Sequence, residues 1–330
     1  MTSIAPHIAA FLQERLPIQR AASPNTCDSY AYAFKLLFEY ASARLGRSPS
    51  ELELEQLDAS MVLGFLDHLE STRGNGASTR NARLAAIKSF FRFVEYRAPS
   101  LLEQSRRILA IPSKRTDTKL VRHLTMEEMR AVIEAPDVGT RPGLRDRAML
   151  HLGFAAGLRV SELVALPCSA LSLHPHPAVR ILGKGRKERC LPLWKQTAGD
   201  LRAWLAVRGE LPGTTELFVS ARRTPMTRSG FAYVLDKHVR LASESCPSLR
   251  DKRVSPHVLR HTCAITVLRA TGDLRKVSLW LGHTDMQTTQ VYLRADPTEK
   301  LETIDAIMPL QLRPGSFKPP DRLLAMLRKP

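Results

Sequence analysis

The chain has 330 residues with ordinary globular proportions, 44% hydrophobic and 25% charged. This length predicts two domains, each large enough to bury a core of its own. No apolar run approaches the roughly 18 residues expected of a membrane span, and the N-terminal segment lacks a secretory pattern, so we expect a cytoplasmic protein without a membrane partner. Five widely spaced cysteines argue against a disulfide framework and predict buried thiols.

The charge balance points to a class of partner. Lysine and arginine number 49 against 32 aspartate and glutamate, a net charge of +17. Residues 1–115 contribute 15 − 11 = +4 and residues 116–330 contribute 34 − 21 = +13. Such a surplus favours a polyanion through counterion release, with nucleic acid as the leading candidate. Charge alone leaves open an anionic membrane surface or a generally basic exterior.

The first third of the chain predicts helices. Apolar residues at helical spacing, with a candidate cap at Ser23 and a stop at Gly46, indicate a long first helix. A second helix is expected to begin after Asp58. Together these patterns predict a small helical bundle. Its expected helices are residues 24–45, the segment after residue 58, residues 77–96 and residues 101–109.

The rest of the chain predicts a second, mostly helical domain. Residues 112–119 are polar, begin at a proline and lack apolar periodicity, which predicts an interdomain linker. Residues 125–128 form a capping-box pattern, and alternating residues on both sides of a glycine-rich turn predict a β-hairpin over 178–193. The fold class is therefore mainly α with a small β-hairpin. The expected domains are 1–111, the linker 112–119, a second domain over 120–308 and a basic, proline-rich tail over 309–330.

The stretch Ser-Pro-His-Val-Leu-Arg-His at residues 255–261 predicts a helix start with Pro256 in the first turn. His257, Arg260 and His261 then share one face, because residues three and four apart are neighbours on a helix. Cations beside a helix N-terminus favour an anion, so this face is a candidate phosphate site. A solvated basic face stays open, as does a zinc pair, although no third ligand is evident.

Two candidate residues follow near the end of the second domain. Asp273 predicts the cap of a helix that ends at Gly282 and leaves His283 at the turn. Tyr292 carries a hydroxyl that is a feasible nucleophile toward a phosphodiester where cations stabilise the developing charge. Taken alone, each has an ordinary explanation, because most such histidines pack or lie in solvent and most tyrosines belong to a core.

Two basic motifs precede these residues. Arg159 follows a glycine in Gly-Leu-Arg-Val-Ser-Glu-Leu, and its planar fork suits phosphate oxygens. Glu162 either orients a neighbouring base or forms a surface ion pair. The second motif, Gly-Lys-Gly-Arg-Lys-Glu-Arg at 183–189, predicts a basic loop able to approach a DNA backbone, or simply an exposed charged turn.

The ordered set of motifs resembles the tyrosine recombinases of the phage integrase family. The resemblance is to the Xer-like bacterial branch and covers nearly the whole chain. It implies that the helical N-terminal domain is similar to the family's core-binding domain and that residues 120–308 form the catalytic domain. The tail after the last motif looks more like that of transposon-encoded integrases. The motifs that carry the resemblance are Arg159 in its glycine-led motif, Lys184 in the basic loop, His257-Val258-Leu259-Arg260-His261, Leu281-Gly282-His283 and Thr288-Thr289-Gln290-Val291-Tyr292.

The resemblance implies a reaction and roles for these residues. Tyr292 would attack a DNA phosphodiester to give a 3′-phosphotyrosyl enzyme and a free 5′-hydroxyl. Arg159, Arg260 and His283 would contact the non-bridging oxygens. Lys184 would be the general acid that protonates the 5′ leaving oxygen. His257 would accept or donate a proton near Tyr292, and Glu162 would support the basic cluster.

The resemblance also implies partners. They are double-stranded DNA with a specific recombination site and a homotetramer around a Holliday junction, with a second recombinase or an accessory protein as a further candidate. No metal or nucleotide cofactor is expected, since the phosphotyrosyl bond conserves the energy of the cleaved bond. Residues 301–308 are expected to dock on a neighbouring subunit. The residues expected to bind DNA are Arg80, Arg83, Lys88, Lys114, Arg115, Arg186 and Lys187.

Three other functions stay open. A DNA-binding clamp without cleavage activity would use the same basic surface, but all six expected catalytic positions are filled. A type IB topoisomerase-like enzyme would share the tyrosine nucleophile and relax a single duplex. A zinc hydrolase built on His257 and His261 is the remaining alternative.

Overall fold

The computed structural model describes residues 2–117, 120–183, 188–283 and 287–295. The chain divides into two compact units, Met1–Thr118 and Lys119–Pro330. Within the described residues, no helix is both long enough and apolar enough to cross a membrane.

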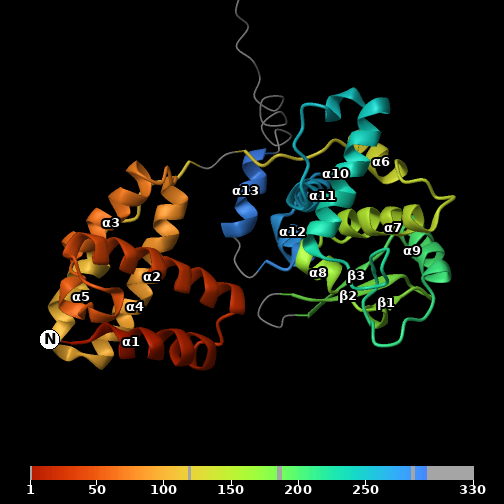
Figure 1. Cartoon of the computed structure of the whole chain (residues 1–330). Helices are drawn as coiled ribbons and strands as arrows, with labels where there is room; N and C mark the ends of the chain where they lie inside the picture. Colours follow the sequence, from red (N-terminus) through yellow and green to blue (C-terminus); the bar gives the residue numbers. More distant parts are fainter. Residues whose placement is uncertain (1, 118–119, 184–187, 284–286, 296–330) are drawn as a thin grey trace, which may run out of the picture. The chain divides into compact units, whose positions relative to one another are not determined.

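Unit 1 is entirely helical in its described part (Figure 1). The five α-helices are joined by short 3₁₀ segments and by a π-helical segment, η1, that continues α1. Their bounds are α1 Ile4–Ala10, η1 Phe11–Gln19, α2 Pro24–Leu45, α3 Ala59–Ser71, α4 Ala77–Arg97 and α5 Leu102–Ala110, with 3₁₀ turns at Pro49–Glu51, Leu54–Gln56 and Pro99–Leu101.

Local sequence signals set the helix ends of unit 1. The Ser23 side chain accepts a hydrogen bond from the backbone N–H of Thr26, and the Asp58 carboxylate accepts one from Met61 at 2.7 Å. Gly46 ends α2 in a left-handed conformation, with φ +64°, which glycine adopts without steric cost. The predicted helices are confirmed to within about one residue at each end.

The N-terminal helix is a difference from the sequence prediction, which assigned no element before residue 24. Phe11, the first residue of η1, is fully buried. Its ring packs against those of Phe34 and Phe90, with 6.0 Å and 5.4 Å between ring centroids. Pro17 lies inside η1, where it lacks the N–H that a regular α-helix would use. Tertiary packing of a few apolar side chains, not periodicity, therefore holds this helix in place.

Unit 2 combines eight α-helices with one three-stranded sheet among its described residues, and Figure 1 shows the strands at one edge of the unit. The sheet has the order β1-β2-β3 and is antiparallel, with Val179 opposite Leu191 and Ile181 opposite Arg189. The predicted hairpin is β2–β3, and β1 is an addition. The bounds are α6 Met126–Glu134, α7 Arg141–Ala155, α8 Val160–Val164, β1 Leu171–Ser172, β2 Ala178–Leu182, β3 Glu188–Pro192, α9 Lys195–Arg208, α10 Arg228–Ser245, α11 Pro256–Thr271, α12 Leu274–Leu281 and α13 Gln287–Ala295.

Two apolar clusters hold unit 2 together. The larger cluster joins helices α6, α7, α9 and α10 to the sheet. The smaller cluster contains side chains of α11, α12 and α13, among them Leu268, Val277 and Tyr292. Val121 packs against this smaller cluster, so the chain entering unit 2 lies beside the helices that carry the last two sequence motifs.

Candidate active site

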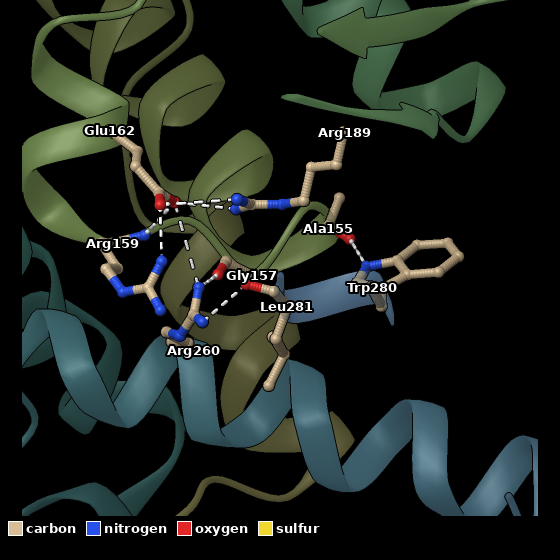
Figure 2. Close-up of polar contacts among 8 residues, drawn as sticks. All are labelled: Ala155, Gly157, Arg159, Glu162, Arg189, Arg260, Trp280 and Leu281. Carbon is tan, nitrogen blue, oxygen red and sulfur yellow. Dashed lines mark hydrogen bonds and ion pairs between the residues drawn. The ribbon is translucent and has the colours of Figure 1, made fainter. Parts of the chain in front are cut away.

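Arg260 occupies the centre of the candidate site on α11. Its guanidinium donates from Nη1 to the carbonyl of Gly157 and from Nη2 to the carbonyl of Leu281 at 2.8 Å, and the residue is only 4% exposed (Figure 2). Gly157 lets the side chains of α11 and α12 pack against this turn, because its φ is +55° and a Cβ there would lie 2.7 Å from the Leu281 side chain and 3.0 Å from Sγ of Cys263.

Glu162 gathers the neighbouring arginines around one carboxylate (Figure 2). It accepts from Nη1 of Arg159 at 2.7 Å and from Nη2 of Arg189 at 2.8 Å, and lies 4.0 Å from Arg260. It also accepts from the backbone N–H of Arg159, which closes a capping box at the start of α8. Three guanidinium groups therefore surround one carboxylate, leaving an excess of positive charge at the site.

Tyr292 lies on α13 beside this cluster and is 2% exposed. Its hydroxyl lies 3.0 Å from Nδ1 of His261, one helical turn after His257 on α11. His257 itself is exposed and stacks on His261 at 6.4 Å between ring centroids. The structure therefore brings His261, rather than His257, to the tyrosine hydroxyl.

His283 also packs against the tyrosine ring. The two rings are nearly parallel, at 8°, with centroids 6.4 Å apart. Nδ1 of His283 lies 2.8 Å from the hydroxyl of Thr289, which is fully buried on α13. Gly282, with φ +64°, ends α12 directly before this histidine.

Burial controls the ionisation of these groups. It lowers the pKa of Arg260 to about 10, with a contribution from the charge of Arg159, so the guanidinium stays protonated at neutral pH. Burial raises the pKa of Tyr292 to about 12, so its hydroxyl is neutral. Burial lowers the pKa of His261 and of His283 to about 4 each, with a smaller electrostatic contribution that comes first from His257 for one ring and from Arg260 for the other.

The pKa directions give the charge state of the site. At neutral pH both Tyr292 and His261 are uncharged, and the tautomer of His261 decides which of the two donates in the hydrogen bond between the tyrosine hydroxyl and Nδ1. Burial alone would raise the pKa of Glu162, but hydrogen bonds from Arg189 and Arg159 lower it, and the carboxylate stays ionised. The site thus holds fixed cations next to a neutral, shielded phenol.

Comparison with known proteins identifies the chain. Residues 122–299 match the Phage integrase family, and residues 8–97 match the phage integrase N-terminal SAM-like domain. The chain belongs to the phage integrase family. The predicted fold class and the predicted enzyme class, a tyrosine-type site-specific DNA recombinase, are confirmed.

Individual relatives of this recombinase support the assignment. It is 42% identical over 98% of both chains to "Putative integrase/recombinase y4rC" of Sinorhizobium fredii. It is 33% identical to Tyrosine recombinase XerC of Pelotomaculum thermopropionicum, over 87% of this chain and 92% of the relative. The crystal structure of XerH site-specific recombinase bound to palindromic difH substrate, a post-cleavage complex, shares the fold, with a TM-score of 0.67 at 23% identity over 87% of this chain and 81% of that chain.

The predicted DNA-binding residues of unit 1 occupy different settings in the recombinase. Arg80 is 4% exposed and donates to the carbonyl of Pro112, so it lies inside the unit and not on its surface. Arg83 donates to the carbonyl of Ser29 and stacks over the ring of Tyr32. Their binding to DNA stays a prediction.

The other cations predicted to bind DNA are closer to solvent. Lys114 is half exposed and pairs with Glu70 at 2.6 Å. Arg115 is exposed, and Lys88 is half-buried, with burial and the charge of Arg92 lowering its pKa. Lys184, Arg186 and Lys187 lie outside the described residues, as do residues 301–308 and the tail 309–330. All of these assignments stay predictions.

Sequence reasoning missed three residues of this site as contributors, namely Arg189, His261 as the tyrosine's partner, and Thr289. Arg189 is the last residue of the basic motif at 183–189. In the hairpin it lies opposite Ile181, on the same face of β3 as the buried Leu191. This alternation of side chains along the strand was the available signal. Among the described residues, no group of three or more His, Cys, Asp or Glu side chains is arranged to hold a metal ion.

Proposed function

We propose that this recombinase cleaves and rejoins DNA at a specific site through a 3′-phosphotyrosine on Tyr292, and exchanges strands through a Holliday junction. The observation that carries the proposal is one cluster: a tyrosine hydroxyl bonded to His261, beside arginines that share the carboxylate of Glu162. Fixed cations next to a nucleophilic hydroxyl are what phosphoryl transfer requires when charge grows on the non-bridging oxygens.

Charge stabilisation falls to Arg159, Arg260 and His283. The arginines are held by backbone carbonyls and by Glu162 before any substrate arrives, so they need no reorganisation during reaction. If the Thr289 hydroxyl donates to Nδ1 of His283, the ring carries its proton on Nε2 and donates from there to a phosphate oxygen. Loss of one such donor costs about 3 kcal/mol of transition-state stabilisation.

Protons are transferred at two oxygens, the attacking hydroxyl of Tyr292 and the leaving 5′-oxygen of DNA. The Tyr292 proton passes to a histidine of α11, for which family similarity favours His257 and the present geometry favours His261. The leaving 5′-oxygen takes its proton from Lys184, an assignment that rests on the sequence motif. Attack by a free 5′-hydroxyl of another duplex then reverses the chemistry without metal or nucleotide cofactor.

The burial of Tyr292 adds a requirement. At 2% exposure the residue offers almost no surface to a DNA phosphate. A phosphodiester therefore reaches the hydroxyl only after part of its surroundings moves. The proposed partners are double-stranded DNA and three further copies of the chain, with a second recombinase or accessory protein as an added partner, and the proposed compartment is the cytoplasm.

Relatives give independent support to the DNA substrate. Solved structures of this fold include XerH bound to difH and a lambda integrase tetramer bound to a Holliday junction. The large excess of basic residues in unit 2 suits the same class of substrate.

The test uses nicked duplexes tiled from DNA that flanks the gene, incubated with the full chain in EDTA and resolved on a denaturing gel. We expect a covalent protein–DNA band that disappears in Tyr292→Phe and persists in Tyr96→Phe, because Tyr96 is 85% exposed on α4. Binding without any band in the wild type would favour a non-cleaving clamp. Covalent bands with relaxation of supercoils, but no joining of two sites, would favour a topoisomerase-like activity.

A further inference from the structure

Arg189 is the buried cation of this site that the proposed reaction leaves without a role. It comes from β3, and its side chain is 9% exposed. Nη2 donates to Oε2 of Glu162 at 2.8 Å, and Nη1 lies 3.4 Å from Oε1 (Figure 2). Its Nε is buried and has no hydrogen-bond partner among the described residues. The position of the guanidinium therefore leaves one of its donors unsatisfied.

The same guanidinium packs against the end of α12. A Cβ built on Gly282 would lie 2.9 Å from Nη1 and 3.1 Å from Cδ of Arg189. Gly282 therefore keeps space for this arginine, and His283 is the next residue. One side chain thus touches both the carboxylate that orients Arg159 and the turn that presents His283.

We propose that Arg189 is a positioning residue, which sets the spacing between Arg159 and His283 so that both contact one phosphate. The inference rests on the proposed function. Arginine suits this place because its planar fork reaches both carboxylate oxygens while Nη1 and Cδ lie close to Gly282. Lysine would carry the same charge on a single nitrogen, which lacks the planar fork, and it would leave the space beside Gly282 unfilled.

A simpler role for Arg189 is neutralisation of Glu162 alone, and a double variant separates the two. Arg189→Met removes one of the buried cations that balance the Glu162 carboxylate, so we expect this variant by itself to react slowly under either role. Glu162→Gln with Arg189→Met removes both charges together. A neutralising role then predicts a rate equal to that of Glu162→Gln, whereas a positioning role predicts a further loss.

The experiment measures single-turnover formation of the covalent product and DNA affinity separately. We expect Arg189→Met and Arg189→Lys each to slow the reaction by about 10- to 100-fold, with DNA affinity changed less than about 3-fold. We expect the double variant to stay about 10-fold below Glu162→Gln. Arg180→Met is the matched control, because Arg180 is exposed on β2 of the same sheet and its loss should leave the rate unchanged.

A second readout does not depend on activity. In histidine-labelled protein, with the His283 signal assigned through His283→Gln, we expect Arg189→Met to shift the ring resonances of His283, and Arg180→Met to leave them in place. Full activity of Arg189→Lys, or a double variant equal to Glu162→Gln, overturns the inference, as do unchanged His283 resonances in Arg189→Met. Absence of covalent product in the wild type overturns the proposed function instead, and the resonances still decide the positioning of His283.

Discussion

The arginine cluster and the nucleophile helix differ in how firmly they are held. Arg260 is bound by two backbone carbonyls from different elements, and Glu162 ties Arg159 and Arg189 together. Tyr292 is bound by one hydrogen bond to His261 and by ring packing. Under the proposed function, the charges that lower the barrier are built in, whereas the attacking group is stored in a neutral, covered form.

The difference has an energetic basis. Burying an arginine is costly unless its donors are satisfied, so a preassembled cation cluster needs several fixed acceptors. A neutral phenol carries no such charge, and its release breaks one hydrogen bond and exposes the buried ring to solvent. Under the proposed function, control over when the reaction occurs belongs to α13, and the maximal rate belongs to the cluster.

The largest expected effect tests the fixed cluster. Arg260→Ala removes the donors to the Gly157 and Leu281 carbonyls together with the central charge, so we expect single-turnover cleavage to fall by about 1,000-fold. Arg260→Lys keeps the charge but does not donate to both carbonyls, and we expect a loss of about 100-fold. Thermal unfolding of each variant separates catalysis from folding. A rate for Arg260→Ala within 10-fold of wild type would refute a central role.

The second effect tests how the nucleophile is stored and deprotonated. His261 bonds the Tyr292 hydroxyl, whereas His257 is exposed one turn away. If His261 accepts the proton, His261→Ala slows cleavage by about 100-fold and His257→Ala by less than 10-fold. The two variants serve as controls for each other in the same nicked-duplex assay. A larger loss in His257→Ala would mean that Tyr292 leaves His261 before it reacts.

The sequence predicted the helix starts and the individual cations better than the contacts that bring the cations together. Helix starts at Asp58, Thr125 and Asp273 were predictable, because a cap is a local interaction over three residues. The family motifs then pointed to the individual cations. The helix before residue 24 was missed, because it depends on tertiary packing and contains a proline within its π-helical part.

Contacts across long sequence separations account for what the sequence could not predict. Arg189 meets Glu162 from 27 residues away through the hairpin, and His261 meets Tyr292 from 31 residues away on another helix. No spacing rule selects His261 over His257, because both lie on the same face of α11. The choice is made by the packing of α13 onto α11, which only the tertiary structure contains.

A smaller effect tests the link between the nucleophile helix and His283. Thr289 is buried, and its hydroxyl is the side-chain partner of Nδ1 of His283. Thr289→Val keeps the shape but removes this hydrogen bond, so we expect about a 10-fold slower cleavage with unchanged DNA affinity. Thr288→Val is the matched control, since Thr288 is exposed on the same helix. Equal rates for the two variants would show that Thr289 does not orient the ring.

The last prediction concerns the stability of unit 2 against pH and not the reaction rate. Burial lowers the pKa of His261 and of His283 from 6.5 to about 4. Between pH 6.5 and pH 4 the unfolded chain binds more protons than the folded one. The free energy of unfolding is therefore highest above pH 6.5 with respect to these two groups, and it falls as the pH drops toward 4. Allowing for the partial exposure of both rings, we expect a loss of about 1–2 kcal/mol per histidine.

Urea unfolding at pH 7 and pH 4.5 measures this loss in the wild type and in the double variant His261→Gln with His283→Gln. The double variant should lose less stability between the two pH values, because glutamine does not titrate, whereas the exposed His174→Gln control should behave as the wild type. The result also bears on the stored nucleophile. A DNA phosphate near His283 favours its protonated form and would raise its pKa, so the neutral ring is a property of the free enzyme. An identical pH dependence in the double variant would show that the two rings titrate in the folded protein as they do in the unfolded chain, so that burial does not hold them in the neutral form.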